Sequence, residues 1–161
     1  KKFCTLLGPR NITEFNYRFA DPKVAHVFAG IEVQERGDIS HLITALKKVG
    51  ITALDLTDNE MAKLHIRHLV GGRAPLAQNE LLYRFEFPER PGALMKFLNS
   101  MSKSWNISLF HYRNHGTDYG RVLVGIQVPP KDKPVFQVFL DKLGYAYWDE
   151  SKNPAYKLFL G

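Results

Sequence analysis

Two stretches of this 161-residue chain, 95 positions apart (106 − 11), carry closely similar sequences. Residues 11–18 (NITEFNYR) match residues 106–113 (NISLFHYR) at five of eight positions. Residues 27–33 (VFAGIEV) match residues 122–128 (VLVGIQV) at four of seven, with the same separation. A period this long, present in two copies, does not fit a solenoid and indicates a duplicated small domain.

The second copy shows a full set of expected elements. Residues 82–87 (LYRFEF) alternate and are rich in aromatic residues, as strands are. Pro91 suits the first position of a helix, and Gly144 suits the end of a later one. The predicted elements are strands at 82–87, 106–113, 119–128 and 145–149, with helices at 93–103 and 134–143.

This order, β-α-β-β-α-β, is that of the split β-α-β or ferredoxin-like unit. It predicts an α+β fold with two tandem ferredoxin-like subdomains, in which helices cover one face of antiparallel sheets. A further short strand is expected at 155–160. The predicted domains are residues 1–72, a linker at 73–81, and residues 82–161.

The first copy follows the same order but starts within a helix. Residues 1–8 have apolar side chains at helical spacing and end in Gly8 followed by Pro9, a helix stop signal. We therefore expect the first strand and the start of the first helix to lie upstream. A short helix is predicted at 58–64, with Asp58 as its cap.

Composition excludes several classes of protein. Apolar residues make up 45% of the chain and charged residues 24%, as in ordinary globular domains. The net charge is +6, but no Arg-rich or aromatic-plus-basic segment indicates nucleic-acid binding. No run approaches the roughly 18 apolar residues of a membrane span. The single Cys4 excludes an internal disulfide, fits a small core residue and a reducing compartment, and so favours a cytoplasmic location.

Familiar catalytic motifs for phosphate binding, acyl transfer and zinc hydrolysis are absent from the sequence. His65 and His68 form an H-x-x-H pair without an acidic third ligand, so no metal site is predicted. Asp55 and Asp149 occupy matched positions at predicted strand ends, where acids are usually structural. We expect no catalytic residues in this chain.

The best candidate for a binding site is the turn at residues 89–94 (ERPGAL), which leads into a helix. Free backbone N–H groups at a helix start can hold a carboxylate, and Gly92 lets a ligand approach the backbone. Nearby apolar residues, with Tyr17 and Tyr112 as polar handles, could form a wall around an aliphatic side chain. The alternative is that these aromatic residues simply build the sheet core.

Longer stretches carry a family resemblance. The turn PERPGAL at 88–94 resembles the ligand loop of ACT domains. Residues 13–21 (TEFNYRFAD), 58–65 (DNEMAKLH), 83–94 (YRFEFPERPGAL) and 105–122 (WNISLFHYRNHGTDYGRV) resemble the C-terminal regulatory region of biosynthetic threonine deaminases. The resemblance covers nearly the whole chain.

This resemblance implies a regulatory fragment of an enzyme that deaminates threonine to 2-oxobutanoate at the start of isoleucine biosynthesis. The fragment would bind isoleucine as a feedback inhibitor and valine as the opposing activator. It would contain no cofactor itself, since pyridoxal phosphate would bind in the catalytic domain of the same polypeptide. The family commonly forms tetramers, so a homo-oligomer is expected.

Repeat symmetry selects the residues expected to contact the effector or carry its signal: Tyr17, Tyr112, Phe15, Phe110, Arg18, Arg113, Pro91, Gly92, Ala93 and Leu94. Two rival functions remain at this point. One is a module that only holds an oligomer together, and the other is a small enzyme on the same fold. The lack of a general-base constellation argues against the second.

Overall fold

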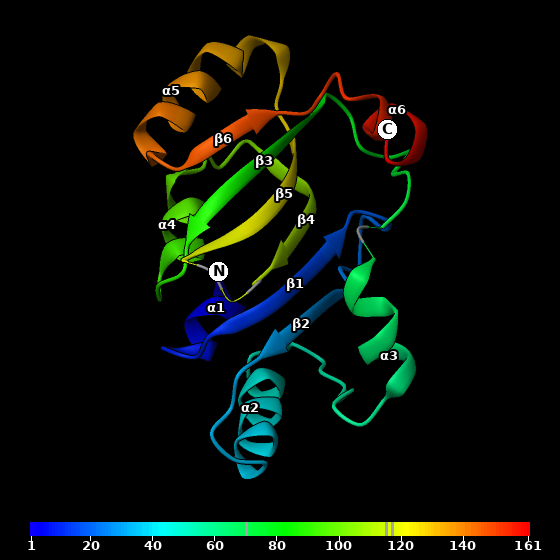
Figure 1. Ribbon diagram of the computed structural model, residues 1–161, viewed down its shortest axis with the longest axis vertical. Coiled ribbons are helices and arrows are strands. Elements are labelled where there is room, and N and C mark those ends of the chain that lie inside the picture. The colour runs from blue at the N-terminus through cyan, green and yellow to red at the C-terminus, as the bar shows by residue number, and fades with distance from the viewer. Residues whose placement is uncertain (70, 115, 117) are drawn as a thin grey trace.

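A single antiparallel sheet of six strands runs through the chain in the computed structural model, which describes residues 1–69, 71–114, 116 and 118–161 (Figure 1). The strand order is β2-β1-β4-β5-β3-β6. The strands are β1 (Ile12–Arg18), β2 (Val27–Ile31), β3 (Glu80–Pro88), β4 (Asn106–Arg113), β5 (Tyr119–Gln127) and β6 (Ala146–Asp149). Below, residues 1–72 are called the first repeat and residues 82–161 the second repeat.

The second repeat forms the β-α-β-β-α-β unit that its sequence predicts. Its helices are α4 (Ala93–Ser100) and α5 (Lys133–Leu143), preceded by the short 3₁₀ helix η2 (Pro130–Asp132). The sheet order β4-β5-β3-β6 places the first strand of the unit between its third and fourth, as in ferredoxin-like folds. The α+β class and the ferredoxin-like arrangement are therefore confirmed.

Both helices of the second repeat pack on the same face of the sheet. Phe97 of α4 and Phe139 of α5 lie with ring centroids 5.7 Å apart, and Phe85 of β3 lies 5.4 Å from Phe97. Phe85 and Phe97 are both fully buried. This aromatic cluster follows from the alternation of β3, which points every second side chain at the helices.

The first repeat contributes two strands and several short helices. These are α1 (Lys2–Leu7), α2 (Gly37–Lys48), α3 (Glu60–Leu64) and the 3₁₀ helix η1 (Ile66–His68). Figure 1 shows α2 beyond β2, at the end of the sheet. Its strand β1 pairs antiparallel with β4 of the second repeat, and this pairing, which we call the seam, joins the repeats into one sheet.

The seam relates the two repeats by an approximate two-fold axis. Phe15 lies opposite Tyr112, the counterpart of Tyr17, and Tyr17 lies opposite Phe110, the counterpart of Phe15. Asn16 and His111 are counterparts that lie opposite each other. Their side chains share a hydrogen bond of 2.7 Å between Asn16 Oδ1 and His111 Nδ1. The axis therefore passes between these two residues.

Local irregularities are repeated together with the sequence. β1 breaks register with β2 between Ile12 and Glu14, and β4 breaks register with β5 between Ile107 and Leu109. Each break precedes a pairing with a glycine, Gly30 or Gly125. A β-bulge conserved between two copies of one chain is a designed feature of the unit.

The expectation of a short strand at 155–160 is wrong. These residues belong to α6 (Pro154–Phe159), a helix at the C-terminal end of the chain. The Asn153 side chain accepts a hydrogen bond of 2.9 Å from the N–H of Ala155, and Pro154 occupies the first turn. An Asn cap followed by Pro is a helix start signal, and it outweighs the weak strand propensity of the residues that follow.

Two details of the first repeat also differ from expectation. The cap of α3 is Asn59, whose Oδ1 accepts from the N–H of Ala62 at 2.9 Å, and not Asp58. Residues 51–56 are irregular instead of forming a strand that ends at Asp55. In the second repeat the matching strand β6 pairs with β3, and the described part of the first repeat has no strand in the place of β3.

Within the described residues, no helix has the length and apolar character needed to cross a membrane. Cys4 lies half-buried on α1, and burial raises the pKa of its thiol. This fits the expected role as a small apolar side chain, because a raised pKa leaves little reactive thiolate at neutral pH.

Candidate functional site

A cavity of about 90 Å³ opens at one end of the seam, between the two repeats. The first repeat provides residues 10–12, and the second provides residues 87–94 together with Phe110 and Tyr112. The volume exceeds several-fold what one water molecule needs. We call this space the seam cavity. Because both repeats form its wall, its shape depends on how they are placed relative to each other.

The polar side of the seam cavity is organised by Glu89. The Tyr112 hydroxyl donates to Glu89 Oε1 at 2.7 Å, and the Asn114 amide donates to Oε2 at 3.0 Å. Burial, and then the hydrogen bond to Glu89, raises the pKa of Tyr112 well above its usual range. Tyr112 therefore stays protonated and donating at neutral pH, and it holds the carboxylate in place.

Gly120 makes this contact possible. A Cβ atom at Gly120 would lie 2.3 Å from the Tyr112 ring and 2.5 Å from Glu89 Oε1. No side chain fits in that space without moving the backbone or the tyrosine. The absence of a Cβ atom lets Tyr112 cross β5 and reach the turn.

The turn that closes the cavity leads into α4. Gly92 precedes the helix with φ of 89°, in the left-handed region that favours glycine. The first N–H groups of a helix have no acceptor within the helix, and they carry partial positive charge. The cavity thus combines helix N–H groups, the Glu89 carboxylate and the apolar side chains of Phe87, Leu94 and Phe110.

The structure brings six of the sequence-predicted residues together in the seam cavity: Pro91, Gly92, Ala93, Leu94, Phe110 and Tyr112. Phe15 lies beneath them, with its ring 5.6 Å from that of Phe110 in an edge-to-face contact. Phe15, Phe110 and Tyr112 share one face of the sheet, and residues 91–94 line the cavity together with Phe110 and Tyr112.

Tyr17 lies elsewhere. It sits on β1 near the other end of the seam, beside a second, more open hollow of about 270 Å³ lined by residues 16–18, 26–28, 66, 69 and 71. Burial raises the pKa of Tyr17. In the described part of the chain its hydroxyl has no hydrogen-bond partner, unlike that of its counterpart Tyr112.

Arg18 and Arg113 point away from the seam cavity, because adjacent strand residues face opposite sides of the sheet. Arg18 forms an ion pair of 2.5 Å with Glu80, and the two side chains are only 9% and 6% exposed. Arg18 also donates to the carbonyl oxygens of Gly72 at 2.8 Å and Leu160 at 2.6 Å. It thereby ties β1 to Glu80 at the start of β3 and to Leu160 directly after α6.

Glu80 has further partners in the second repeat. The Ser108 hydroxyl donates to Oε1, and the Tyr156 hydroxyl donates to Oε2 at 2.8 Å. Both oxygens of the buried carboxylate are therefore satisfied, as burial of a charge requires. Gly71, with φ of 94°, leaves room for Arg18, since a Cβ atom there would lie 2.8 Å from the Arg18 Cβ.

The other residues considered from the sequence take structural roles. Among the described residues, no group of three His, Cys, Asp or Glu side chains could hold a metal ion, and His65 and His68 fall under this statement. Asp55 and Asp149 each accept a backbone N–H two residues on, from Thr57 and Ser151. Hydrogen bonds from Thr57 lower the pKa of Asp55.

Sequence reasoning missed the first repeat's share of the seam cavity, namely Arg10, Asn11 and Ile12, and the central place of Glu89. Residues 11 and 12 are the first residues of the repeated stretch 11–18, and this repeat is the only sequence signal that points to them. Only the antiparallel register of β1 and β4 brings them next to the turn of the other copy.

Comparison with known proteins agrees with this picture. Residues 1–66 and 71–160 match the family described as the C-terminal regulatory domain of threonine dehydratase. The chain is 58% identical over 160 residues to the biosynthetic L-threonine dehydratase of Burkholderia multivorans, covering 99% of this chain and 32% of the relative. It is 52% identical to that of Escherichia coli and 47% identical to the mitochondrial threonine dehydratase of Saccharomyces cerevisiae.

The E. coli and yeast comparisons cover 99% of this chain but 31% and 29% of those relatives, so the chain spans about a third of their length. Among solved structures, an aspartate kinase from Synechocystis shares the fold, with a TM-score of 0.50 and 17% identity over 91% of this chain and 25% of that one. With a family match over nearly its full length, this chain belongs to the C-terminal regulatory domains of threonine dehydratases.

Proposed function

We propose that the seam cavity binds a small branched aliphatic amino acid, with isoleucine as inhibitor and valine as opposing activator of the full-length enzyme. The observation that carries the proposal is a cavity formed by both repeats. Its wall contains a carboxylate, the partially positive N–H groups at the start of α4 and apolar side chains. Glu89 would receive the ammonium group of the ligand, and the N–H groups at the start of α4 would receive its carboxylate. Phe110 and Leu94 would contact the aliphatic side chain.

Linkage explains how such binding would regulate distant chemistry. A ligand shifts a conformational equilibrium only by its difference in affinity for the two states. Because the seam cavity has walls from both repeats, its affinity depends on their relative position. Typical couplings between sites amount to about 1–3 kcal/mol, which small movements at the seam could supply.

Isoleucine and valine differ by one methylene group, worth about 0.8 kcal/mol of apolar burial. This difference is too small for one cavity to accept one ligand and reject the other. We infer that the two compete for related sites and favour different arrangements of the repeats. Tyr17 lines the second hollow, and its hydroxyl has no hydrogen-bond partner among the described residues, so it would belong to a second site.

The catalytic chemistry belongs, in this proposal, to the part of the full-length protein that this chain does not span. The lysines of this chain are all solvent-exposed, and none lines the seam cavity, so its residues do not fit a buried site for pyridoxal phosphate. A cytoplasmic location, threonine as the substrate of the whole enzyme and assembly into a homo-oligomer are parts of the same proposal. A domain that serves assembly alone would lack selective amino-acid binding.

Isothermal titration of the chain with isoleucine and valine tests the proposal. Both should bind, and saturating valine should suppress the heat of isoleucine binding. Tyr112→Phe removes the hydroxyl that holds Glu89, and it should weaken isoleucine binding about tenfold, or about 1.4 kcal/mol.

Tyr147→Phe is the matched control, since its hydroxyl accepts from Gln137 on the surface at 2.9 Å and is remote from the cavity. Equal affinity in the parent chain and in Tyr112→Phe would remove the tyrosine from the site. No heat with any branched amino acid would leave assembly as the function.

A further inference from the structure

Arg113, at the end of β4, is a partly buried cation with no counter-charge in the described chain. Among the described residues it takes part in no ion pair and no hydrogen bond of its side chain. It lies on the face of the sheet opposite the seam cavity, because its neighbour Tyr112 points into that cavity. A guanidinium that is partly removed from water without a partner is costly.

The internal repeat shows what such a position binds when it is satisfied. Arg113 is the counterpart of Arg18, at the same offset that relates Asn16 to His111. Arg18 receives the carboxylate of Glu80 at 2.5 Å and the carbonyl oxygens of Gly72 and Leu160. One copy of the repeated arginine is thus enclosed by acceptors, whereas the side chain of the other copy has none among the described residues.

The carboxylate closest in register to Arg113 forms an ion pair with a different residue. Glu14 lies directly opposite Arg113 across the seam. Its carboxylate forms an ion pair with Arg67 of η1 and lies against Gly30, as Glu80 lies against Gly125 in the other repeat. The carboxylate of Glu14 therefore satisfies Arg67 and leaves the charge of Arg113 uncompensated.

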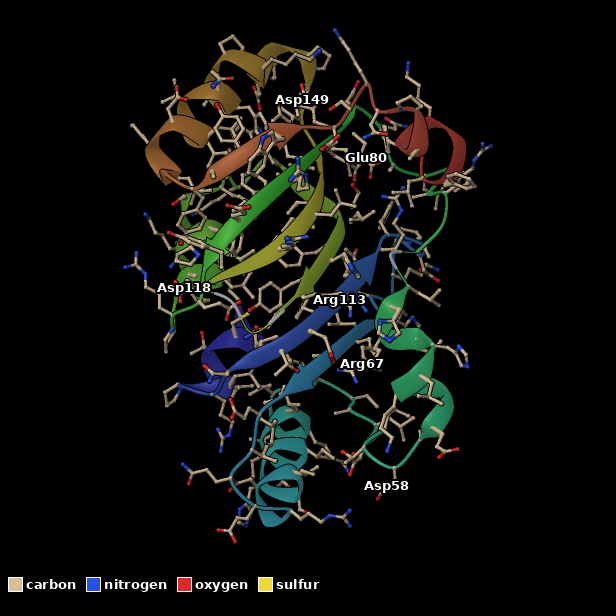
Figure 2. The ribbon with its side chains drawn as sticks, viewed as in Figure 1. Asp58, Arg67, Glu80, Arg113, Asp118 and Asp149 are labelled. Carbon is tan, nitrogen blue, oxygen red and sulfur yellow. The ribbon has the colours of Figure 1, made fainter. Side chains whose placement is uncertain are left out.

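Arg67 and two histidines lie near the same point. Desolvation, followed by the charges of Arg113, Arg67 and His65, lowers the pKa of His68. These groups thus lie within electrostatic reach of one another. Figure 2 labels Arg113 beside β1 and Arg67 beside β2, close to one another in this view. With one positive charge on each arginine and one negative charge on Glu14, the cluster keeps a net positive charge.

We propose that Arg113, with Arg67 and His68 beside it, binds a carboxylate group that is not part of the described chain. A guanidinium presents parallel N–H groups that match the two oxygens of a carboxylate. The arginine in the equivalent position of the other repeat binds a carboxylate, which favours this group over phosphate. The site is separate from the seam cavity and does not rest on the proposed function.

Titration of the chain with sodium acetate, followed by NMR of the backbone amides and the arginine Nε–H groups, tests this assignment. Sodium chloride at equal ionic strength provides the reference. Acetate should produce saturable shifts at Arg113, Arg67 and His68. Arg113→Gln should weaken acetate binding at least tenfold, while Arg36→Gln, which removes an exposed charge directly before α2, should leave it unchanged.

Glu14→Gln is a second variant, and it is expected to strengthen acetate binding instead of weakening it. It removes the competing carboxylate and frees Arg67, so acetate should bind several-fold more tightly. Repeating the titration with isoleucine distinguishes two sources of the group. Tighter binding of isoleucine than of acetate at Arg113 points to a free amino acid, and equal binding points to a carboxylate side chain of a protein.

Three results would overturn the proposal. The first is that chloride alone reproduces the shifts. The second is that Arg113→Gln, with an otherwise native spectrum, binds acetate like the parent chain. The third is that inorganic phosphate binds at these residues while acetate does not.

Discussion

The arginines at equivalent positions of the two repeats, Arg18 and Arg113, lie in different environments. Arg18 is buried against Glu80 of β3, and it also donates to the carbonyl oxygens of Gly72 and of Leu160, which directly follows α6. Removing one partner of such a pair leaves an uncompensated buried charge, which is far more costly than breaking an exposed pair. The network around Arg18 is therefore the point where a single change should disturb the seam most strongly.

Glu80→Gln is expected to lower the free energy of unfolding by about 3 kcal/mol, because it leaves the Arg18 guanidinium buried without its carboxylate. Asp58→Asn is the control, since it breaks an ion pair with Arg36 whose side chains are 79% and 84% exposed. Urea unfolding of the two variants measures the difference. Equal effects would mean that the network around Arg18 contributes no more than a surface pair.

The starts of two helices, α4 and α6, position residues that matter for the site and for the contacts of Arg18. The start of α4 shapes the candidate ligand site, and the start of α6 fixes the C-terminal residues beside Arg18. Both starts are marked in the sequence, by Pro91-Gly92 and by Asn153-Pro154. The start of α4 can be predicted from the sequence, whereas that of α6 cannot, because the short apolar run after Pro154 fits a strand as well as a helix.

Asn153→Ala removes the side-chain acceptor at the start of α6 and should destabilise the chain by about 1 kcal/mol. Asn153→Asp, which keeps an acceptor and suits the helix dipole, should retain most of the stability. Thermal unfolding followed by circular dichroism checks both variants. If alanine proved as stable as asparagine, the cap would not hold α6 in place.

Most of the strands and helices could be predicted because alternation and helical spacing are strong in the second repeat. The strand expected before Asp55 could not be, since a strand needs a partner as well as a pattern. The candidate site likewise has a part that the sequence predicts and a part that it does not. The turn at 88–94 is a local signal, whereas the contribution of Arg10 and Ile12 depends on the pairing of β1 with β4, which no local pattern specifies.

At the scale of the whole molecule, several tyrosines with raised pKa values make the free energy of unfolding fall at alkaline pH. Burial, with the nearby Asp149, raises the pKa of Tyr83 to about 12, and burial with Glu80 raises that of Tyr156 to about 12. Tyr112 is raised as well. An unfolded tyrosine has a pKa of about 10, so the folded state retains these protons longer than the unfolded state does.

The stability that these tyrosines contribute is therefore complete below about pH 10 and is lost as the pH rises toward about 12. Urea unfolding at pH 9 and at pH 11 should show a clear decrease at the higher value. Tyr83→Phe removes one titrating hydroxyl, whose hydrogen bond to Asp149 is long at 3.4 Å, and it should make the decrease shallower. An unchanged slope would exclude Tyr83 as a contributor.

The position of Asn16 and His111 on the two-fold axis bears on the ancestry of the chain. An assembly of two identical halves would have placed two copies of one side chain face to face there, as two amides or two imidazoles. Once the halves were fused into a single polypeptide, each side of that contact could change independently. A complementary donor and acceptor now meet at the axis, an arrangement that two identical subunits could reach only by breaking their symmetry.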